Sequence, residues 1–233
     1  MRSFDSAFLL PKMVVLYYDL VRVGILQVRR DLLREASIIA VVAISLFILV
    51  RYCWLIWKER IKPALAMWVF FSIAVGGSLI TYLSAGDYSL LDNILNTSDL
   101  VMVVTVSVFI FIFGDRSSRF NRFDLGCLIA VLAILAFWII SQHHVVSHVS
   151  IQVILVIAYF PVISRIWKSN ENTESFAAWI GLFLNPCISL LSSKGVLATI
   201  YALRAIISTS LLLALMVRAE LKQRNDRKSE PAI

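Results

Sequence analysis

One arginine of this chain lies inside a long apolar segment, where a charged side chain is energetically unfavourable. Arg204 is the tenth residue of an apolar run from Gly195 to Val217. A guanidinium in the middle of such a run costs roughly 2.5 to 3.5 kcal/mol to insert into a membrane, so it faces a bundle interior or a water-filled cavity. The sequence therefore predicts either a site for an anionic or carbonyl-bearing solute or a structural ion pair, and Asp99 is the best candidate partner.

Three polar residues could join Arg204 around such a cavity. Tyr201 and Ser208 lie three positions before it and four after it, so a helix places all three on one face. Asn185 lies in the preceding apolar run, beside Pro186. A proline inside a helix frees a backbone carbonyl, which can bind solute beside a cavity. We predict that Tyr201, Ser208 and Asn185 contact the substrate and that Pro186 is a hinge.

The histidines do not indicate a metal site. His144 and His148 have the i, i+4 spacing of two ligands on one helical face, and His143 is adjacent, but the sequence offers no third ligand beside them. We expect all three to be loop residues between two apolar runs. The chain has no H-E-x-x-H motif and no paired acidic motif inside an apolar run. We predict no catalytic residue, no metal and no cofactor.

The acidic residues bear on how transport would be driven. Asp87, Asp92, Asp99 and Asp115 all lie at the ends of apolar runs. Proton-driven transporters usually carry a carboxylate or a histidine inside the membrane. The sequence therefore favours a facilitator, which needs no coupling proton.

Composition places these residues in a membrane protein. Of 233 residues, 60% are hydrophobic, and the mean hydropathy is +0.84, which leaves too little polar surface for a soluble globule. The apolar runs are continuous rather than alternating, and this selects helices over a barrel. The net charge of +7 gathers at the ends of apolar runs, so we expect a lipid bilayer and a small-molecule substrate as partners, and no nucleic acid. Homo-oligomerisation stays open.

Seven apolar runs have about the length that crosses roughly 30 Å of hydrocarbon. A helical pattern from Met13 to Leu33 precedes them and indicates either an interfacial amphipathic helix or an accessory span. The charged tail from Arg218 is expected to lack regular structure. The runs are Ser37 to Trp57, Ala64 to Tyr82, Thr97 to Gly114, Leu125 to Ser141, Val149 to Trp167, Phe176 to Leu191 and Gly195 to Val217.

Basic residues set the expected orientation. Lys and Arg dominate the tail and the loops after the first, third and fifth runs, whereas the loops on the opposite side contain only Lys194. This distribution places the C-terminus in the cytoplasm. The cluster from Arg29 to Arg34 argues the other way, because it stays outside in this arrangement. We expect an integral, multi-pass protein of the plasma (inner) membrane.

Two hairpins of the sequence match each other. Trp57-Lys58 ends the first run and Trp167-Lys168 ends the fifth, while Met67-Trp68 and Ala178-Trp179 open the following runs, at offsets of 110 and 111. The match predicts two parallel three-helix units joined by one linker helix, with the substrate between them near the midplane. Trp68 and Trp179 then either stack on a planar or sugar ring or belong to the interfacial aromatic belt.

The predicted fold is an all-α membrane protein with seven transmembrane helices in a 3+1+3 arrangement. Its parts are an N-terminal amphipathic or accessory helix (1–36), a first three-helix repeat (37–115), a linker helix (116–146), a second three-helix repeat (147–217) and a cytoplasmic tail (218–233).

The second hairpin resembles one found in a known superfamily. Tyr159-Phe160-Pro161-Val162, followed by Arg165 to Ser169 and by Thr173-Glu174-Ser175, is similar to the PQ-loop hairpin of the SWEET sugar facilitators, the Pnu-type vitamin transporters and the KDEL receptors. The three-plus-one-plus-three layout of that superfamily covers residues 37–217. Val162 stands where the motif has glutamine, and the first repeat has Arg51 where the second has Pro161, so the resemblance selects no substrate.

The resemblance implies that Pro161 is a hinge for alternating access, the alternative being a kink that only shapes packing. We expect a facilitator that moves a small polar solute, such as a sugar, a vitamin or nucleoside, or a small carboxylate, between the two repeats. A membrane receptor or sorting protein that binds a ligand in the same cavity is the alternative. An intramembrane enzyme is the third candidate.

Overall fold

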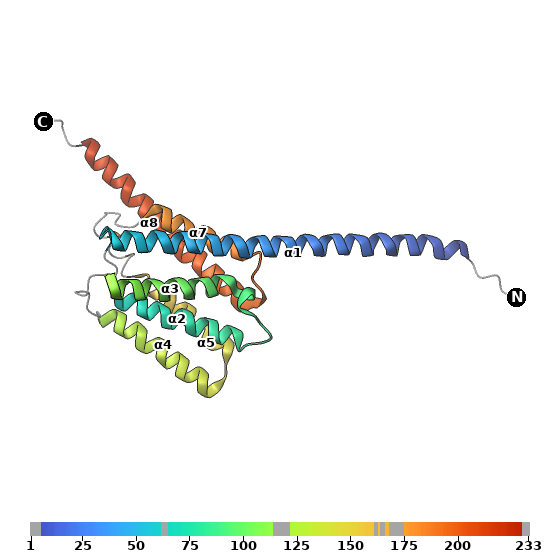
Figure 1. Cartoon of the computed structure of the whole chain (residues 1–233), viewed down its shortest axis with the longest axis horizontal. Coiled ribbons are helices and arrows are strands. Elements are labelled where there is room, and N and C mark those ends of the chain that lie inside the picture. The colour runs from blue at the N-terminus through green and yellow to red at the C-terminus, as the bar shows by residue number, and fades with distance from the viewer. Residues whose placement is uncertain are drawn as a thin grey trace.

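The fold consists of helices throughout the described part of the chain (Figure 1). The computed structural model describes residues 6–61, 65–113, 122–160, 163, 166–167 and 175–229, with side chains from residue 22 to residue 223 apart from residues 66 and 124. No strand occurs in these ranges, and the predicted all-α class is confirmed. The elements are α1 (Ser6–Trp57), α2 (Leu65–Leu83), the 3₁₀ helix η1 (Leu90–Asn93), α3 (Ile94–Phe113), α4 (Arg122–Ser141), α5 (His144–Ile157), α7 (Phe176–Ser189) and α8 (Gly195–Ser229).

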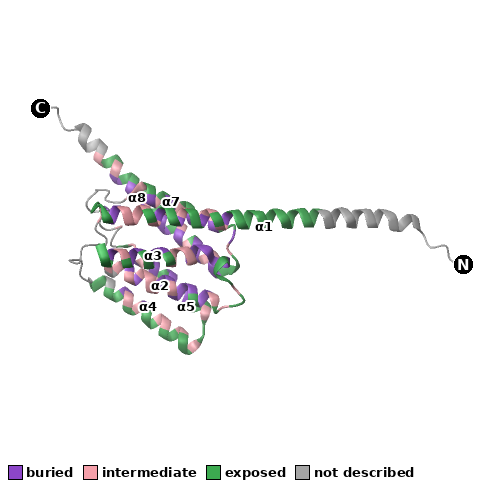
Figure 2. Cartoon of the chain, viewed as in Figure 1, coloured by how far each residue is buried: buried purple, intermediate pink, exposed green. Residues whose placement is uncertain are grey.

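Helix α1 joins two segments that the sequence analysis treated separately. It runs for 52 residues without a break, from the N-terminal segment through the first apolar run. The residues around the expected boundary at 36/37, Arg34-Glu35-Ala36, include good helix formers and no glycine or proline, so nothing there ends the helix. Residues 22–36 are exposed and project beyond the bundle toward the N-terminus (Figure 2).

The prediction that regular structure ends at Arg218 was wrong. Helix α8 continues to Ser229, twelve residues into the charged tail. The added segment is rich in Ala, Glu, Leu, Lys, Gln and Arg, which have the highest helix propensities. The Arg218 guanidinium also lies 4.0 Å from the ring centre of Trp167, and Ala219 is buried, so the first turn of the extension packs on the bundle.

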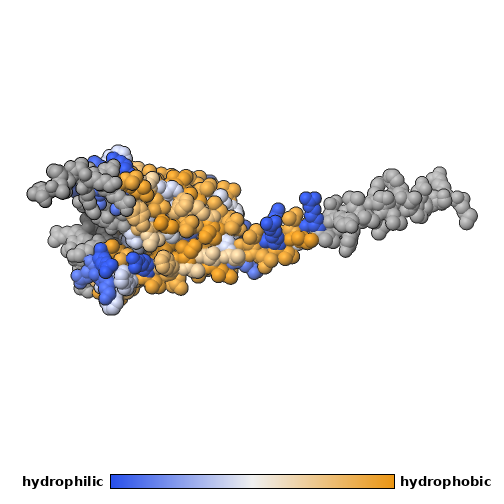
Figure 3. Space-filling model, turned by 90° about the horizontal axis from the view of Figure 1, so that it is seen from above, coloured by the Kyte–Doolittle hydropathy of each residue, from blue (hydrophilic) through white to orange (hydrophobic). Residues whose placement is uncertain are grey.

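Within the described residues, three helices are long and apolar enough to cross a membrane, by length and composition. They are Arg22–Trp57, Leu90–Phe113 and Gly195–Gln223, and four shorter apolar helices accompany them. Figure 3 shows an apolar surface over the middle of the bundle, with hydrophilic residues gathered at the end where α8 leaves it. This distribution is typical of a membrane protein.

The helices pack in a regular order. Helix α3 packs against both α1 and α2, and α8 packs against both α5 and α7. The two groups meet through α1 against α7 and α2 against α5, while α4 lies on α2 and α5 (Figure 1). The main buried cluster draws on α1, α2, α3, α5 and α8, and Ile48, Phe70, Val106, Leu155 and Tyr201 are among its members.

Gly181 allows a close approach of α7 to α1. A Cβ built there would lie 3.1 Å from two carbons of Ile48, whereas a Cβ at Gly126 in α4 would meet nothing within 4 Å. We expect Gly181→Leu to lower the free energy of unfolding by about 1–3 kcal/mol through overpacking, as a lower melting temperature in detergent. Gly126→Leu is the matched control and should melt at or above the wild-type temperature. Equal melting temperatures for the two variants would contradict this account of the contact.

Candidate functional site

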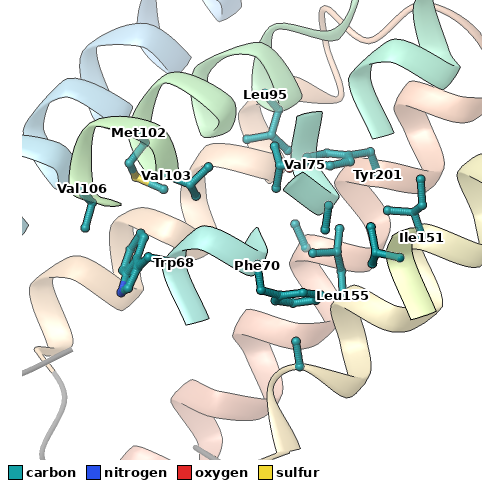
Figure 4. Packing of buried hydrophobic residues seen from close by; sticks show 14 of the residues in the cluster. Trp68, Phe70, Val75, Leu95, Met102, Val103, Val106, Ile151, Leu155 and Tyr201 are labelled. Carbon is teal, nitrogen blue, oxygen red and sulfur yellow. The ribbon is translucent and has the colours of Figure 1, made fainter. Parts of the chain in front are cut away.

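A cavity of about 130 Å³ lies between the helices that meet at the centre of the bundle. Figure 4 shows buried side chains of α2, α3, α5 and α8 in the interior of the bundle, and five of those labelled, Trp68, Val75, Met102, Leu155 and Tyr201, also line the cavity. The lining residues are Tyr52, Met67, Trp68, Phe71, Val75, Asp99, Met102, Val103, Leu155, Ala158, Tyr159, Trp179, Leu182, Tyr201 and Arg204. The cavity therefore draws on both groups of helices.

Aromatic rings form much of the cavity wall, and they contact one another. Trp68 packs on Tyr52 with ring centres 5.1 Å apart, and Trp179 meets Tyr159 edge-on at 6.1 Å. Tyr159 also meets Phe71 edge-on at 6.1 Å. Trp68 and Trp179 thus line the same cavity, and each packs against a tyrosine.

Arg204, Tyr201 and Asp99 form the charged part of the wall. The Tyr201 hydroxyl donates to Asp99 Oδ2 at 2.8 Å, and the Arg204 guanidinium lies over the Tyr201 ring, 4.7 Å from its centre. No ion pair joins Arg204 to Asp99 among the described residues. Tyr201 therefore stands between the two charges, and both retain atoms that a ligand can reach.

A series of hydrogen-bonded polar side chains positions the Arg204 guanidinium. Arg204 Nε donates to Gln152 Oε1 at 3.2 Å, and Gln152 Nε2 donates to Ser78 Oγ at 2.8 Å. The ring of His148 lies 3.1 Å from the Ser78 carbonyl oxygen and 3.3 Å from the Thr81 hydroxyl. These contacts join α8, α5 and α2 and fix the position of the guanidinium, because a buried charge is stable only with satisfied neighbours.

Sequence reasoning missed Gln152 and misplaced His148. His144 and His148 were expected in a loop, but both lie in α5, and His148 is fully buried, so that expectation was wrong for these two residues. His143 is the residue just before the helix. The available signal was the i, i+4 spacing of His148, just before the fifth apolar run, and Gln152 within it, which places two polar side chains on one helical face. The described residues contain no cluster of three metal-ligating side chains.

The positions of His148 and Asp99 remove the premise of the facilitator prediction. The prediction of a facilitator required acidic residues and histidines to lie only at the ends of the helices. Instead, Asp99 lines the cavity and His148 is buried among three helices. The mode of energy coupling is thus open.

Two of the predicted substrate contacts lie away from the cavity wall. Asn185 is buried between α7 and α1, where its Nδ2 donates to Ser45 Oγ at 2.8 Å. Ser208 is buried in α8, one turn beyond Arg204. Pro186 lies inside α7, which continues past it to Ser189, and Pro161 lies outside the described residues.

Charged side chains around Asp92 join several elements at one end of the bundle. Arg34 Nη2 binds Asp92 Oδ1 at 2.8 Å, and Lys194 Nζ lies 3.7 Å from Oδ2. The Ser89 backbone N–H and hydroxyl donate to Oδ2 at 2.8 and 2.9 Å. This cluster, from here the Asp92 cluster, ties α1, η1 and the turn between α7 and α8 together.

Uncharged contacts reinforce the same end. The hydroxyls of Ser37 in α1 and Ser192 after α7 lie 3.0 Å apart, and Ser37 also donates to the Ile188 carbonyl at 2.7 Å. The Lys194 backbone N–H donates to the Asp92 carbonyl at 2.9 Å. In contrast, the cavity lining includes Tyr52 near the end of α1 and Met67 near the start of α2, at the opposite end of these helices. The cavity therefore extends toward the end of the bundle opposite the Asp92 cluster.

No protein-family model, curated protein or solved structure matches the chain.

Proposed function

We propose that this protein is a multi-pass membrane transporter that moves a small polar solute by alternating access between two three-helix units. The first unit contains α1, α2 and α3, and the second contains α5, α7 and α8. The cavity with Arg204 and Asp99 is the substrate site, and α4 is the linker helix. The single observation that carries the proposal is a pair of equivalent hydrogen bonds between the units.

These two bonds are related by one sequence offset. Asn185 in α7 donates to Ser45 in α1, and Gln152 in α5 donates to Ser78 in α2. Gln152 lies 107 positions after Ser45, and Asn185 lies 107 positions after Ser78. An exchange of the two units by this offset therefore converts one bond into the other, which is what a twofold axis between repeated units requires.

Cavity residues and helix order support the same relation. Tyr52 and Tyr159, and likewise Val75 and Leu182, line the cavity and are 107 positions apart. In each unit the third helix packs against the other two. By this offset Trp179 corresponds to Ser72, so Trp68 and Trp179 are shifted by about one helical turn relative to an exact match.

A cavity that is closed at one end is the form expected of one state in an alternating-access cycle. The Asp92 cluster and the Ser37–Ser192 contact close the end at which α1 enters the bundle. The distribution of basic residues favours a plasma (inner) membrane location with the C-terminus in the cytoplasm. In that orientation the closed end faces outward.

Counterflow into proteoliposomes tests the proposal against a receptor. The purified protein is reconstituted with an excess of unlabelled solute inside, and labelled sugars, nucleosides, vitamins, carboxylates and amino acids are added outside in turn. We expect transient accumulation of at least one label. A solute that binds the protein but shows no exchange would identify a receptor, and a complete absence of exchange across the panel would contradict transport.

A further inference from the structure

We propose that the cavity takes a small zwitterion, with its carboxylate on Arg204 and its ammonium group on Asp99. The inference depends on the proposed function in treating this cavity as the substrate site. It adds the chemical class of the solute and gives Asp99 a role as a substrate contact.

Arg204 keeps free donors for a ligand. A guanidinium carries five N–H donors, and its polar neighbours here are the Gln152 oxygen at 3.2 Å and the Tyr159 hydroxyl. These two contacts use at most two donors. None of the Arg204 nitrogens is both fully buried and without a hydrogen-bond partner. The residue lines the cavity, so a ligand there can reach the remaining donors. The planar guanidinium, with its remaining N–H donors side by side, can bind both oxygens of a carboxylate.

Asp99 keeps a free acceptor. Its Oδ2 accepts from Tyr201 at 2.8 Å, and its Oδ1 has no hydrogen-bond partner among the described residues. Asp99 also lines the cavity. An ammonium group carries three donors and can bind Oδ1 while Tyr201 keeps Oδ2.

Tyr201 sets the distance between the two subsites. Its ring packs against the Arg204 guanidinium, and its hydroxyl donates to the Asp99 carboxylate. Both charged groups therefore contact the same tyrosine side chain. A solute whose own opposite charges are a few ångströms apart can therefore meet both. An α-amino acid, with one carbon between its charged groups, has this form.

Charge balance favours a zwitterion over an ion of single charge. Arg204 and Asp99 are the charged residues of the wall within the described part of the chain, and together they are neutral. A monoanion on Arg204 leaves the Asp99 carboxylate unpaired beside it, and a cation on Asp99 leaves Arg204 unpaired. Each unpaired charge in this partly buried site is costly. A zwitterion pairs both and keeps the site neutral.

The remaining wall limits the size and character of the solute. The volume of about 130 Å³ is close to that of an apolar cavity that takes benzene, so roughly six to nine non-hydrogen atoms fit. Phe71, Val75 and Leu182 supply apolar surface to the same wall. A short aliphatic side chain, as in alanine or valine, suits this space better than a sugar ring with hydroxyls on every side.

Matched ligands test the charge requirement directly. Binding to the purified protein is measured by thermal shift and calorimetry for valine, 3-methylbutanoate, which lacks the ammonium group, and isobutylamine, which lacks the carboxylate. Alanine, propionate and ethylamine form a second set. We expect each zwitterion to bind at least about tenfold more tightly than both of its relatives of single charge.

Two variants assign the subsites. Arg204→Gln should remove the preference for valine over isobutylamine, and Asp99→Asn should remove the preference for valine over 3-methylbutanoate. The reciprocal pattern distinguishes specific contacts from a general loss of folding, which would lower all affinities together. If neither zwitterion binds more tightly than its relatives, or if Asp99→Asn leaves both preferences unchanged, the proposal is overturned.

Transport assays keep this inference separate from the proposed function. Tight valine binding with no exchange in proteoliposomes would contradict the transporter and leave the zwitterion site in place. Exchange of a sugar or a nucleoside, with no binding of either zwitterion, would contradict the zwitterion site and leave the transporter in place.

Discussion

Replacing Arg204 with Gln is expected to weaken solute binding by about 30-fold or more. Loss of one partner from a desolvated, hydrogen-bonded charge pair costs about 2–5 kcal/mol, and Arg204 is the only cation in the cavity wall in the described part of the chain. Arg204→Lys should lie between the wild type and Arg204→Gln, because an ammonium group keeps the charge but not the planar fork. Calorimetric titration with the solute that exchanges in counterflow is the measurement.

Ser208→Ala is the matched control for this prediction. Ser208 lies four residues after Arg204 in the same helix, is buried, and does not line the cavity. The hydroxyl has no hydrogen-bond partner among the described residues, so its removal should leave affinity within about twofold of the wild type. A comparable loss of affinity in both variants would point to a disturbed helix and would remove Arg204 from the binding account.

Replacing Asp92 with Asn is expected to open the closed end of the bundle. The substitution removes the charge that binds Arg34 at 2.8 Å, and for this half-exposed, charge-assisted hydrogen bond we expect a contribution at the lower end of about 1.5–3 kcal/mol. The attraction of Lys194, whose Nζ lies 3.7 Å from Oδ2, is weaker. A loss of about 1.4 kcal/mol already shifts a two-state equilibrium tenfold. We therefore expect at least about tenfold faster labelling of a cysteine at position 75 in the cavity wall by a membrane-impermeant maleimide added at the Asp92 end.

The labelling experiment uses a protein in which Cys53, Cys127 and Cys187 are replaced by serine. Asp87→Asn, at an exposed position in the turn before η1, is the control and should label at the parental rate. A labelling rate for Asp92→Asn equal to that of the control would show that the Asp92 cluster does not hold the cavity closed.

Much of the helical framework was predictable, because long apolar runs in a membrane leave the backbone few alternatives. The run from Phe176 to Leu191 corresponds closely to α7, and the run from Thr97 to Gly114 corresponds to α3. The ends were less predictable. Polar segments after Leu33 and after Val217 were interpreted as boundaries, although their residues favour helix and the helices continue through them.

The charged residues of the candidate site were predictable from the sequence, and the polar residues that position them were less so. Arg204 was identified from the cost of a buried charge, and Tyr201 from its spacing on the same helix. Gln152 and Ser78 gave weaker signals, since a single neutral polar residue in an apolar run is common. Asn185 was assigned to the cavity for the same reason, whereas the structure uses it to join α7 to α1. Which of two buried positions a polar side chain faces depends on helix rotation, and tertiary packing sets that rotation.

A reversible disulfide across the closed end tests alternating access most directly. Ser37 and Ser192 belong to different units, and their hydroxyl oxygens lie 3.0 Å apart, so cysteines at both positions can form a bridge with little change in packing. In the background without other cysteines, we expect oxidation of Ser37→Cys/Ser192→Cys to reduce solute exchange in proteoliposomes at least about tenfold, with solute binding retained and full exchange restored by reduction. Exchange at the same rate in the oxidised and reduced protein would contradict transport by relative movement of the two units.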